Sequence, residues 1–224
     1  MSIILNIDTS IETASVSIAK DGIIIASLKN VIQKEHAGFL HLAIQDLLLR
    51  SSLELKQMDA IAVTKGPGSY TGLRVGMASA KGLCYALNKP FISIGTLNAL
   101  AVAAINETKK NDRDNSLFCP MIDARRMEVY TAIFDADMNE VIAPCAMVLT
   151  GNSFEELLQN NNIVFVGSGT LKWSSLVESA NTSFLNEIDI TDAISNLSYN
   201  KFKHKDFTDL SYSEPLYVKD FFSA

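Results

Sequence analysis

Three polar side chains that could contact a phosphate or a metal follow the first apolar run of the chain, as Asp8-Thr9-Ser10. The end of a buried strand is a usual place for such contacts in α/β proteins. An equally good explanation is that Asp8 accepts hydrogen bonds within its own turn, as aspartates in turns commonly do. These three residues are therefore candidates for weak nucleotide binding, and the sequence predicts no other cofactor.

A glycine-rich loop, Gly66-Pro-Gly68, separates an apolar strand pattern from a helical pattern. Glycine allows positive φ and proline fixes φ without donating a hydrogen bond, so the loop ends the strand. Ser69 or Thr71 is the expected N-cap of the helix. The loop is not a Walker A loop, because no Gly-x-x-x-x-Gly-Lys occurs. Its spacing to Gly72 is also one residue too long for the dinucleotide fingerprint.

The helical pattern at 71–87 is rich in small residues, and two ridges of them lie on different faces. Each interior glycine costs about 1 kcal/mol relative to alanine, so close packing must offset that cost. The first ridge is Gly72, Gly76, Ala80 and Cys84, and the second is Ala78, Gly82 and Ala86. The neighbour could be another helix, the chain's own strand at 60–64, or a ligand.

We predict that the first ridge forms a helix-to-helix interface with a partner. The preceding helical pattern, near Glu35, contributes its apolar face. The expected partner-interface residues are Leu40, Ile44, Leu47, Gly72, Leu73, Gly76, Met77, Ala80 and Cys84. The alternative is that the first ridge packs inward on the strand at 60–64.

The sequence predicts neither a metal site nor a catalytic residue. His36 and His41 are five residues apart on a helix and point about 140° away from each other. A catalytic zinc needs about three protein ligands, and no such set is present. The segment from Asp123 to Glu128 favours cross-strand ion pairing, and the alternative is a binding role for Arg125 or Glu128. No spacing suggests a Ser–His–Asp or Cys–His arrangement.

The composition excludes several classes of protein. The chain has 224 residues and a formal net charge of −6, so it is not expected to bind nucleic acid by itself. The three cysteines are odd in number and far apart, which favours a reducing, cytoplasmic location over a disulfide framework. No stretch is apolar enough for a membrane helix, and the first residues lack the basic region of a signal peptide.

The expected elements form two lobes. The first lobe, residues 1–106, has the order βββαβαβα, which predicts a mixed sheet with helices on its faces. Asp21-Gly22 predicts a type I′ hairpin in this lobe. A polar, aperiodic stretch at 106–116 marks the boundary. The second, smaller lobe, residues 107–224, is expected to contain strands, a helix at 190–204 and an extended C-terminal segment.

Five motifs together carry a family resemblance: Ile7-Asp-Thr-Ser10, Lys65-Gly-Pro-Gly-Ser-Tyr-Thr-Gly-Leu-Arg-Val-Gly-Met77, Lys81-Gly-Leu83, Asp123-Ala-Arg-Arg-Met-Glu-Val-Tyr130 and Glu214-Pro-Leu-Tyr217. These motifs resemble the TsaB family, also called YeaZ. The resemblance runs over most of the chain and is most specific in its first half. It implies the sugar kinase/Hsp70/actin-like (ribonuclease-H-like) α/β fold.

The resemblance also implies a role in forming threonylcarbamoyladenosine (t6A) beside the tRNA anticodon. It implies that the chain is the non-catalytic dimerisation partner of the catalytic paralogue TsaD, accompanied by the ATPase TsaE. The predicted interface would then meet the same helices of TsaD, or a second copy of this chain when TsaD is absent. tRNA would be met only through the complex.

The catalytic paralogue carries a His-x-x-x-His metal motif near the place where this chain has Thr96 and Leu100. The resemblance therefore implies no metal here. The alternative functions are a small-molecule kinase or a metallopeptidase-like enzyme of the same fold. A kinase would need a second phosphate loop, for which Gly167-Ser-Gly169 is the candidate.

Overall fold

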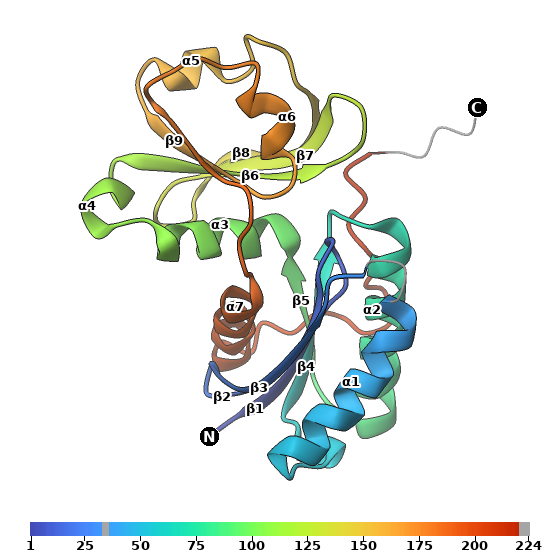
Figure 1. Cartoon of the computed structure of the whole chain (residues 1–224). Coiled ribbons are helices and arrows are strands. Elements are labelled where there is room, and N and C mark those ends of the chain that lie inside the picture. The colour runs from blue at the N-terminus through green and yellow to red at the C-terminus, as the bar shows by residue number, and fades with distance from the viewer. Residues whose placement is uncertain (33–35, 220–224) are drawn as a thin grey trace. The chain divides into compact units, whose positions relative to one another are not determined.

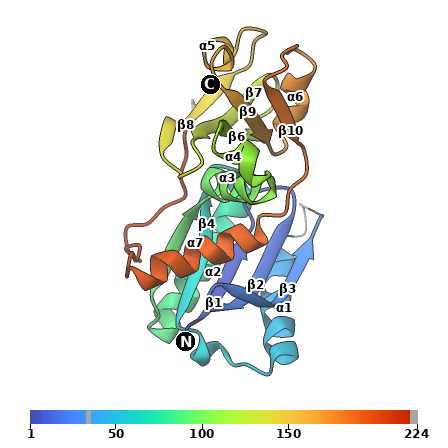
Figure 2. The same cartoon turned by 90° about the vertical axis from the view of Figure 1, so that its left-hand side faces the viewer.

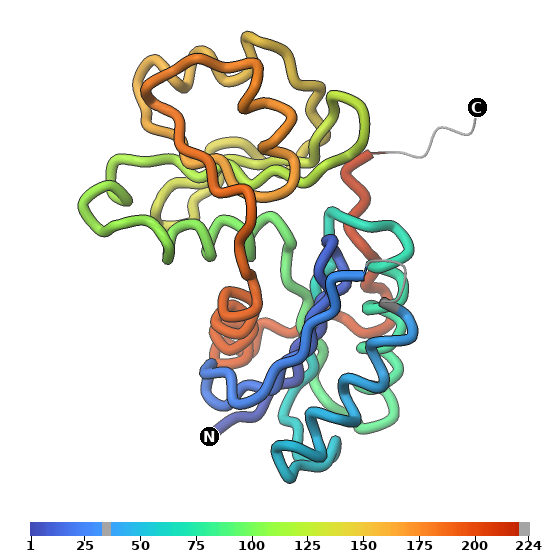
Figure 3. The backbone as a smooth tube through the Cα atoms, in the orientation of Figure 1, coloured from blue at the N-terminus to red at the C-terminus, as the bar shows by residue number. Residues whose placement is uncertain are grey.

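The structure is a computed structural model that describes residues 1–32 and 36–219, and the chain divides into two compact units. The first unit comprises residues 1–96 and 191–216, and the second comprises 97–190 with the segment that begins at Tyr217. Each unit is built on a five-stranded sheet (Figure 1). The tube in Figure 3 follows the chain as it leaves the first unit after residue 96 and returns to it at residue 191.

The sheet of the first unit is mixed. In spatial order its strands are β3 (Ile23–Asn30), β2 (Ala14–Lys20), β1 (Ile3–Asp8), β4 (Ala60–Gly66) and β5 (Phe91–Gly95). β1 pairs antiparallel with β2 and parallel with β4. Asp21 and Gly22 join β2 to β3 with φ angles of 50° and 84°, so the predicted type I′ hairpin is confirmed.

Two helices cover one face of this sheet, and a third covers the other face (Figures 1 and 2). α1 (His36–Ser51) and α2 (Tyr70–Leu87) enclose the main apolar core with β1, β2 and β4. α7 (Thr191–Lys203) packs on the opposite face, chiefly against β1 and β5. The predicted order βββαβαβα is confirmed, with one added 3-10 turn at 55–57. The predicted helix start near Glu35 lies outside the described residues.

Local signals define both ends of α2. Ser69 is the N-cap, and its Oγ accepts a hydrogen bond from the Gly72 amide at 3.3 Å. Asn88 ends the helix in the left-handed conformation, with φ 52°, and its amide donates to the Cys84 carbonyl. Asparagine tolerates this conformation better than most residues, because its short polar side chain bonds locally. Of the two predicted N-caps, Ser69 is confirmed.

The sheet of the second unit contains, in spatial order, β10 (Thr182–Leu185), β9 (Asn162–Val166), β6 (Ser116–Asp123), β7 (Glu128–Phe134) and β8 (Glu140–Val148). Its helices are α3 (Thr96–Glu107), which begins at the last residue of the first unit, and the short α4 (Lys110–Arg113), α5 (Glu155–Leu158) and α6 (Thr170–Ser174). Trp173 is fully buried, with its ring 4.6 Å from that of Phe165 and 5.2 Å from that of Phe154. This aromatic cluster anchors α6 on the sheet.

The division between the units differs from the boundary expected at residue 106. α7 belongs to the first unit, where Ser198 Oγ donates to Asn6 Oδ1 of β1 at 2.6 Å. Most of α3 belongs to the second unit. The polar stretch at 106–116 holds the end of α3, all of α4 and the start of β6. Its polarity reflects exposed helix and strand ends, so it did not mark a linker.

The predicted partner-interface residues lie in the core of the first unit, so that prediction is wrong. At Gly72 an added Cβ would overlap the Thr9 carbonyl, and at Gly76 it would overlap Thr9 Oγ1 and lie 3.3 Å from Val63 Cγ2. The predicted residues that carry side chains are at most 4% exposed: Leu40, Ile44, Leu47, Leu73, Met77, Ala80 and Cys84. The first ridge packs inward on β1 and β4, which is the alternative that the sequence left open.

Gly76 and Gly82 of α2 form a matched pair that tests this packing. Gly76→Arg should lower the free energy of unfolding by about 3 kcal/mol or more, because overpacking and an unpaired buried charge both destabilise a core. Gly82→Arg should leave it unchanged or raise it by up to about 0.8 kcal/mol, since arginine has the better helix propensity. A Cβ at Gly82 meets nothing within 4 Å. Urea denaturation followed by circular dichroism measures both. Equal stability of the two variants would contradict the inward packing.

Candidate functional site

The segment Asp8-Thr9-Ser10 is buried at the end of β1 and bonded to its own unit. Asp8 Oδ1 accepts hydrogen bonds from the Ser10 amide at 2.9 Å, Ser10 Oγ at 2.6 Å and Thr64 Oγ1 at 2.6 Å. Thr9 Oγ1 donates to the Gly72 carbonyl at 2.7 Å. The three side chains are at most 1% exposed. They join β1 to β4 and α2, and nucleotide binding at this segment stays a prediction.

The glycine loop closes against the same segment. The Ser69 amide donates to the Ser10 carbonyl at 2.7 Å, and a Cβ at Gly68 would overlap that carbonyl. Gly66 has φ 108°, which favours glycine. The Leu216 amide donates to the Lys65 carbonyl at 2.7 Å, which ties the C-terminal segment of the first unit to this loop. The glycines are therefore explained by close approach of one backbone to another.

The surfaces of α1 and α2 that point away from the sheet carry exposed apolar and small residues. We call this surface the outer helical face, and it comprises Gly38, Leu42, Gln45 and Leu49 of α1 with Ala78, Gly82, Tyr85 and Ala86 of α2. Leu42, Leu49 and Tyr85 are 69%, 73% and 83% exposed. The two helices pack together, and His41 Nε2 lies 3.3 Å from Ser79 Oγ.

The sequence contained a signal for the outer helical face. Leu42 and Leu49 are seven residues apart, and they fall on the side of α1 opposite to the buried Leu40 and Leu47. The second ridge of α2 marks the matching stripe on that helix. Sequence reasoning placed the first ridge at a partner interface, whereas the structure buries it, because small residues pack equally well inward and outward.

The β6–β7 hairpin does not contain the cross-strand ion pairs that were predicted. Asp123 pairs with Lys172 of α6 at 2.7 Å, and Glu128 pairs with Lys219 of the C-terminal segment at 2.8 Å. Between these acids, Arg125 and Arg126 have φ angles of 70° and 49°. The left-handed conformation costs about 1–2 kcal/mol for a residue with a Cβ. This turn therefore holds two arginines in a disfavoured conformation.

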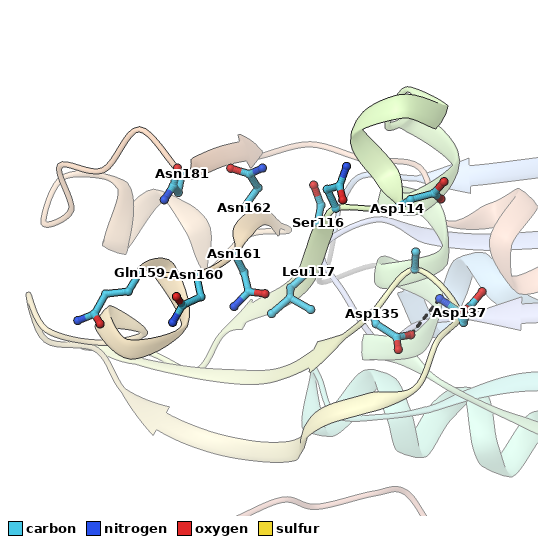
Figure 4. A pocket seen from close by; sticks show the side chains of 12 residues that line it. Asp114, Ser116, Leu117, Asp135, Asp137, Gln159, Asn160, Asn161, Asn162 and Asn181 are labelled. Carbon is cyan, nitrogen blue, oxygen red and sulfur yellow. Dashed lines mark hydrogen bonds between the residues drawn. The ribbon is translucent and has the colours of Figure 1, made fainter.

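An open hollow of about 700 Å³ lies at one end of the strands of the second sheet, beside the start of β6 and the β7–β8 turn (Figure 4). Carboxylates and amides line it, and none of the residues drawn in Figure 4 carries a positive charge. Asp135 belongs to its own turn, because its Oδ1 accepts from the amides of Asp137 and Asn139, each at 2.9 Å. Hydrogen bonds from Asn139, with the one from Asp137, hold the pKa of Asp135 below its ordinary value.

Sequence reasoning missed this hollow, and its signal was the amide run from Gln159 to Asn162. The Asp135 carboxylate stays ionised, and the amides that line the hollow with it have no base beside them. These groups therefore do not form an acid–base pair. The hollow is therefore a polar surface feature without assembled catalytic groups among the residues that Figure 4 draws.

The cysteines of the core are poor nucleophiles. Burial raises the pKa of the Cys84 and Cys119 thiols to about 12, so both stay protonated at neutral pH. Within residues 1–32 and 36–219, no three His, Cys, Asp or Glu side chains are grouped so that they could hold a metal ion. No helix in the same ranges is long and apolar enough to cross a bilayer.

Comparison with known proteins gives consistent matches. The family model described as TsaD, tRNA N6-adenosine threonylcarbamoyltransferase, matches residues 24–213. The tRNA threonylcarbamoyladenosine biosynthesis protein TsaB of Bacillus subtilis is 30% identical over 179 residues, which are 78% of this chain and 75% of that protein. TsaB of Escherichia coli is 34% identical over 177 residues, which are 77% of this chain and 74% of that protein.

The structure of YeaZ from Pseudomonas aeruginosa superposes with a TM-score of 0.77 at 23% identity, covering 97% of this chain and 100% of that one. This likeness confirms the expected sugar kinase/Hsp70/actin-like fold. Two bacterial TsaB proteins match over more than two thirds of their lengths, and the related family model spans most of the chain. The chain therefore belongs to the TsaB (YeaZ) family.

Proposed function

We propose that this chain takes part in the biosynthesis of t6A in tRNA, the process that the names of its relatives state for those proteins. Within that process we assign it the role of a non-catalytic subunit that scaffolds the threonylcarbamoyltransferase TsaD. One observation carries this proposal. It is the outer helical face, an exposed surface of apolar and small residues on two packed helices.

The outer helical face has the chemistry of a helix-packing surface. The small residues Ala78 and Gly82 would let a further helix approach more closely than the usual separation of about 8–10 Å between helix axes. Leu42, Leu49 and Tyr85 supply exposed apolar area, worth about 25 cal/mol for each Å² that a partner removes from water. Exposed apolar clusters of this kind favour a protein partner.

TsaD is the partner that fits this face best. The family model described as TsaD matches residues 24–213, so the two proteins share a common fold, and this range includes α1 and α2. Two related chains that pair through the same helices form an arrangement close to two-fold symmetry, the commonest symmetry of protein dimers. A second copy of this chain would take the place of TsaD when TsaD is absent. TsaE and tRNA would meet the assembled complex.

The residues available for chemistry support a non-catalytic role. Near the place where the resemblance expects the metal-binding histidines of TsaD, this chain has Thr96 and Leu100, which are 0% and 2% exposed. Neither side chain can replace a histidine as a metal ligand. The loop that a kinase would need is packed on β6, where the Gly169 amide donates to the Met121 carbonyl at 3.0 Å. A Cβ at Gly169 would lie 2.8 Å from Val129 Cγ1. These contacts therefore support neither a small-molecule kinase nor a metallopeptidase-like enzyme.

Gly82→Arg should weaken binding to TsaD at least tenfold, or about 1.4 kcal/mol, because it places a long charged side chain in the middle of the outer helical face. The matched control is Gly151→Arg, the same change at an exposed glycine of the second unit where a Cβ also meets nothing within 4 Å. Titration calorimetry with purified TsaD measures both variants beside the parent. Parent-like affinity of the Gly82→Arg variant would overturn the assignment of this face.

The isolated chain is expected to transfer no threonylcarbamoyl group and to hydrolyse no ATP above background. The reason is that the described residues contain no metal-binding group of His, Cys, Asp or Glu side chains, while Asp8 is bonded within the fold and the Cys84 and Cys119 thiols stay protonated. Turnover assays on fractions of a sizing column test this expectation. Activity that follows the chain's own peak, and not a contaminant's, would refute the non-catalytic assignment.

The isolated chain should bind tRNA weakly, with a dissociation constant above about 100 μM near physiological salt. Its formal net charge of −6 allows little release of counterions from the RNA. Fluorescence anisotropy with labelled tRNA measures this affinity, and addition of TsaD should tighten it. Submicromolar binding by the chain alone would contradict the view that tRNA is met through the complex.

A further inference from the structure

The tip of the β6–β7 hairpin carries two adjacent cations to which the proposed scaffold role gives no task. Arg125 and Arg126 are both exposed. Neither guanidinium makes an ion pair or a hydrogen bond with another described residue. Two such groups side by side are a strong local source of positive charge on an acidic chain.

The carboxylates beside these arginines are already paired with other cations. Lys172 Nζ lies 2.7 Å from Asp123 Oδ1, and Lys219 Nζ lies 2.8 Å from Glu128 Oε2. The tip and its partners thus combine four cationic and two anionic side chains, whereas the whole chain has a net charge of −6. The two lysines neutralise the acids, so both arginines remain available to an external anion.

Hydrogen bonds hold the tip in one conformation. The Arg125 amide donates to Asp123 Oδ1 at 2.6 Å, and the Glu128 amide donates to the Arg125 carbonyl at 3.1 Å. The Leu149 amide donates to the Met127 carbonyl at 2.7 Å, which ties the tip to the end of β8. A fixed backbone reduces the conformational entropy that the arginines would lose on binding a ligand.

The residue types at the tip are not explained by the fold. Arg125 and Arg126 both have positive φ, a conformation that glycine and asparagine adopt more readily than arginine. Glycine or asparagine would form this turn with less backbone strain, and the described contacts use only the backbone of the two arginines. The guanidinium groups are therefore the feature of the tip that the described fold does not use.

A longer basic run, at 201–205, is largely used within the fold. Lys201 pairs with Asp206 at 2.7 Å, and Lys203 lies over the Tyr199 ring at 5.4 Å. Two of the three lysines in the run at 201–205 therefore have partners of their own, whereas neither guanidinium group of the hairpin tip has one among the described residues. This contrast selects the hairpin tip as the anion-binding candidate.

We infer that Arg125 and Arg126 bind the phosphodiester backbone of RNA when this chain is part of its complex. A guanidinium donates two parallel hydrogen bonds to phosphate oxygens, which a lysine ammonium cannot do. Successive phosphates of one strand offer matching acceptors to two neighbouring arginines. This inference rests on the proposed function, because the tRNA supplies the phosphates. It gives the second unit a positioning task that involves no chemistry.

The test is the double variant Arg125→Asn/Arg126→Asn in complex with TsaD. Asparagine tolerates positive φ, so the hairpin should keep its conformation while both charges are lost. The affinity of the complex for tRNA should fall about tenfold near physiological salt. The logarithm of the association constant falls as the logarithm of the salt concentration rises, and the magnitude of this negative slope should decrease by about 1.5, as the loss of two phosphate contacts requires. Anisotropy over a salt series measures both, and a sizing column checks that the complex is intact.

The matched control is Lys203→Asn/Lys205→Asn, which also removes two cations and also includes a residue at positive φ, since Lys205 has φ 56°. This control should keep the parent's slope. An unchanged slope in the arginine variant, or an equal decrease in the control, would overturn the inference and leave the proposed function standing. Loss of the complex on the sizing column would instead indicate that the tip contacts TsaD, and this result would also overturn the inference. No tRNA binding by the unmodified complex would overturn both proposals.

Discussion

The contact between the backbone of α2 and the end of β1 is the constraint on which the first unit depends. Thr9 lies so close to Gly72 and Gly76 that no side chain fits at either position. Asp8 fixes the same end of β1 by accepting hydrogen bonds from Ser10 and Thr64. The two glycines are unfavourable in a helix, but they let the helix approach the sheet closely enough to bury its apolar residues. This inward packing leaves the other side of α2 exposed.

The opposite face of the same sheet is held by polar contacts from the far end of the chain. Ser195 Oγ donates to the Gly22 carbonyl, and Ser198 Oγ donates to Asn6 Oδ1. Residues 97–190 lie between the two segments that build the first unit. The first unit therefore depends on contacts between residues that are far apart in sequence, and closing the long loop between them costs conformational entropy.

On the proposed function, each unit contributes one surface to a larger assembly. The first unit offers the apolar outer helical face, and the second offers the cationic hairpin tip. The two surfaces suit different ligands, because apolar area favours a protein and paired guanidinium groups favour phosphate. Three buried groups with catalytic potential are unsuited to chemistry: Asp8 is bonded within the fold, where it joins strands, and Cys84 and Cys119 stay protonated thiols. Under this proposal the chain supplies binding surfaces, and the chemistry belongs to its partner.

The sequence by itself determined the order of elements in the first unit, the Asp21-Gly22 hairpin and the family, and it limited the cap of α2 to Ser69 or Thr71. These features depend on local periodicity, turn chemistry and motifs. It did not reveal which ridge of α2 faces inward. Small residues satisfy a core and an interface equally well, and only the position of Thr9 decides between them. The tertiary structure also decided that α7 completes the first unit and that lysines outside the hairpin pair with its acids. Those contacts join residues far apart in the chain, and no local pattern encodes them.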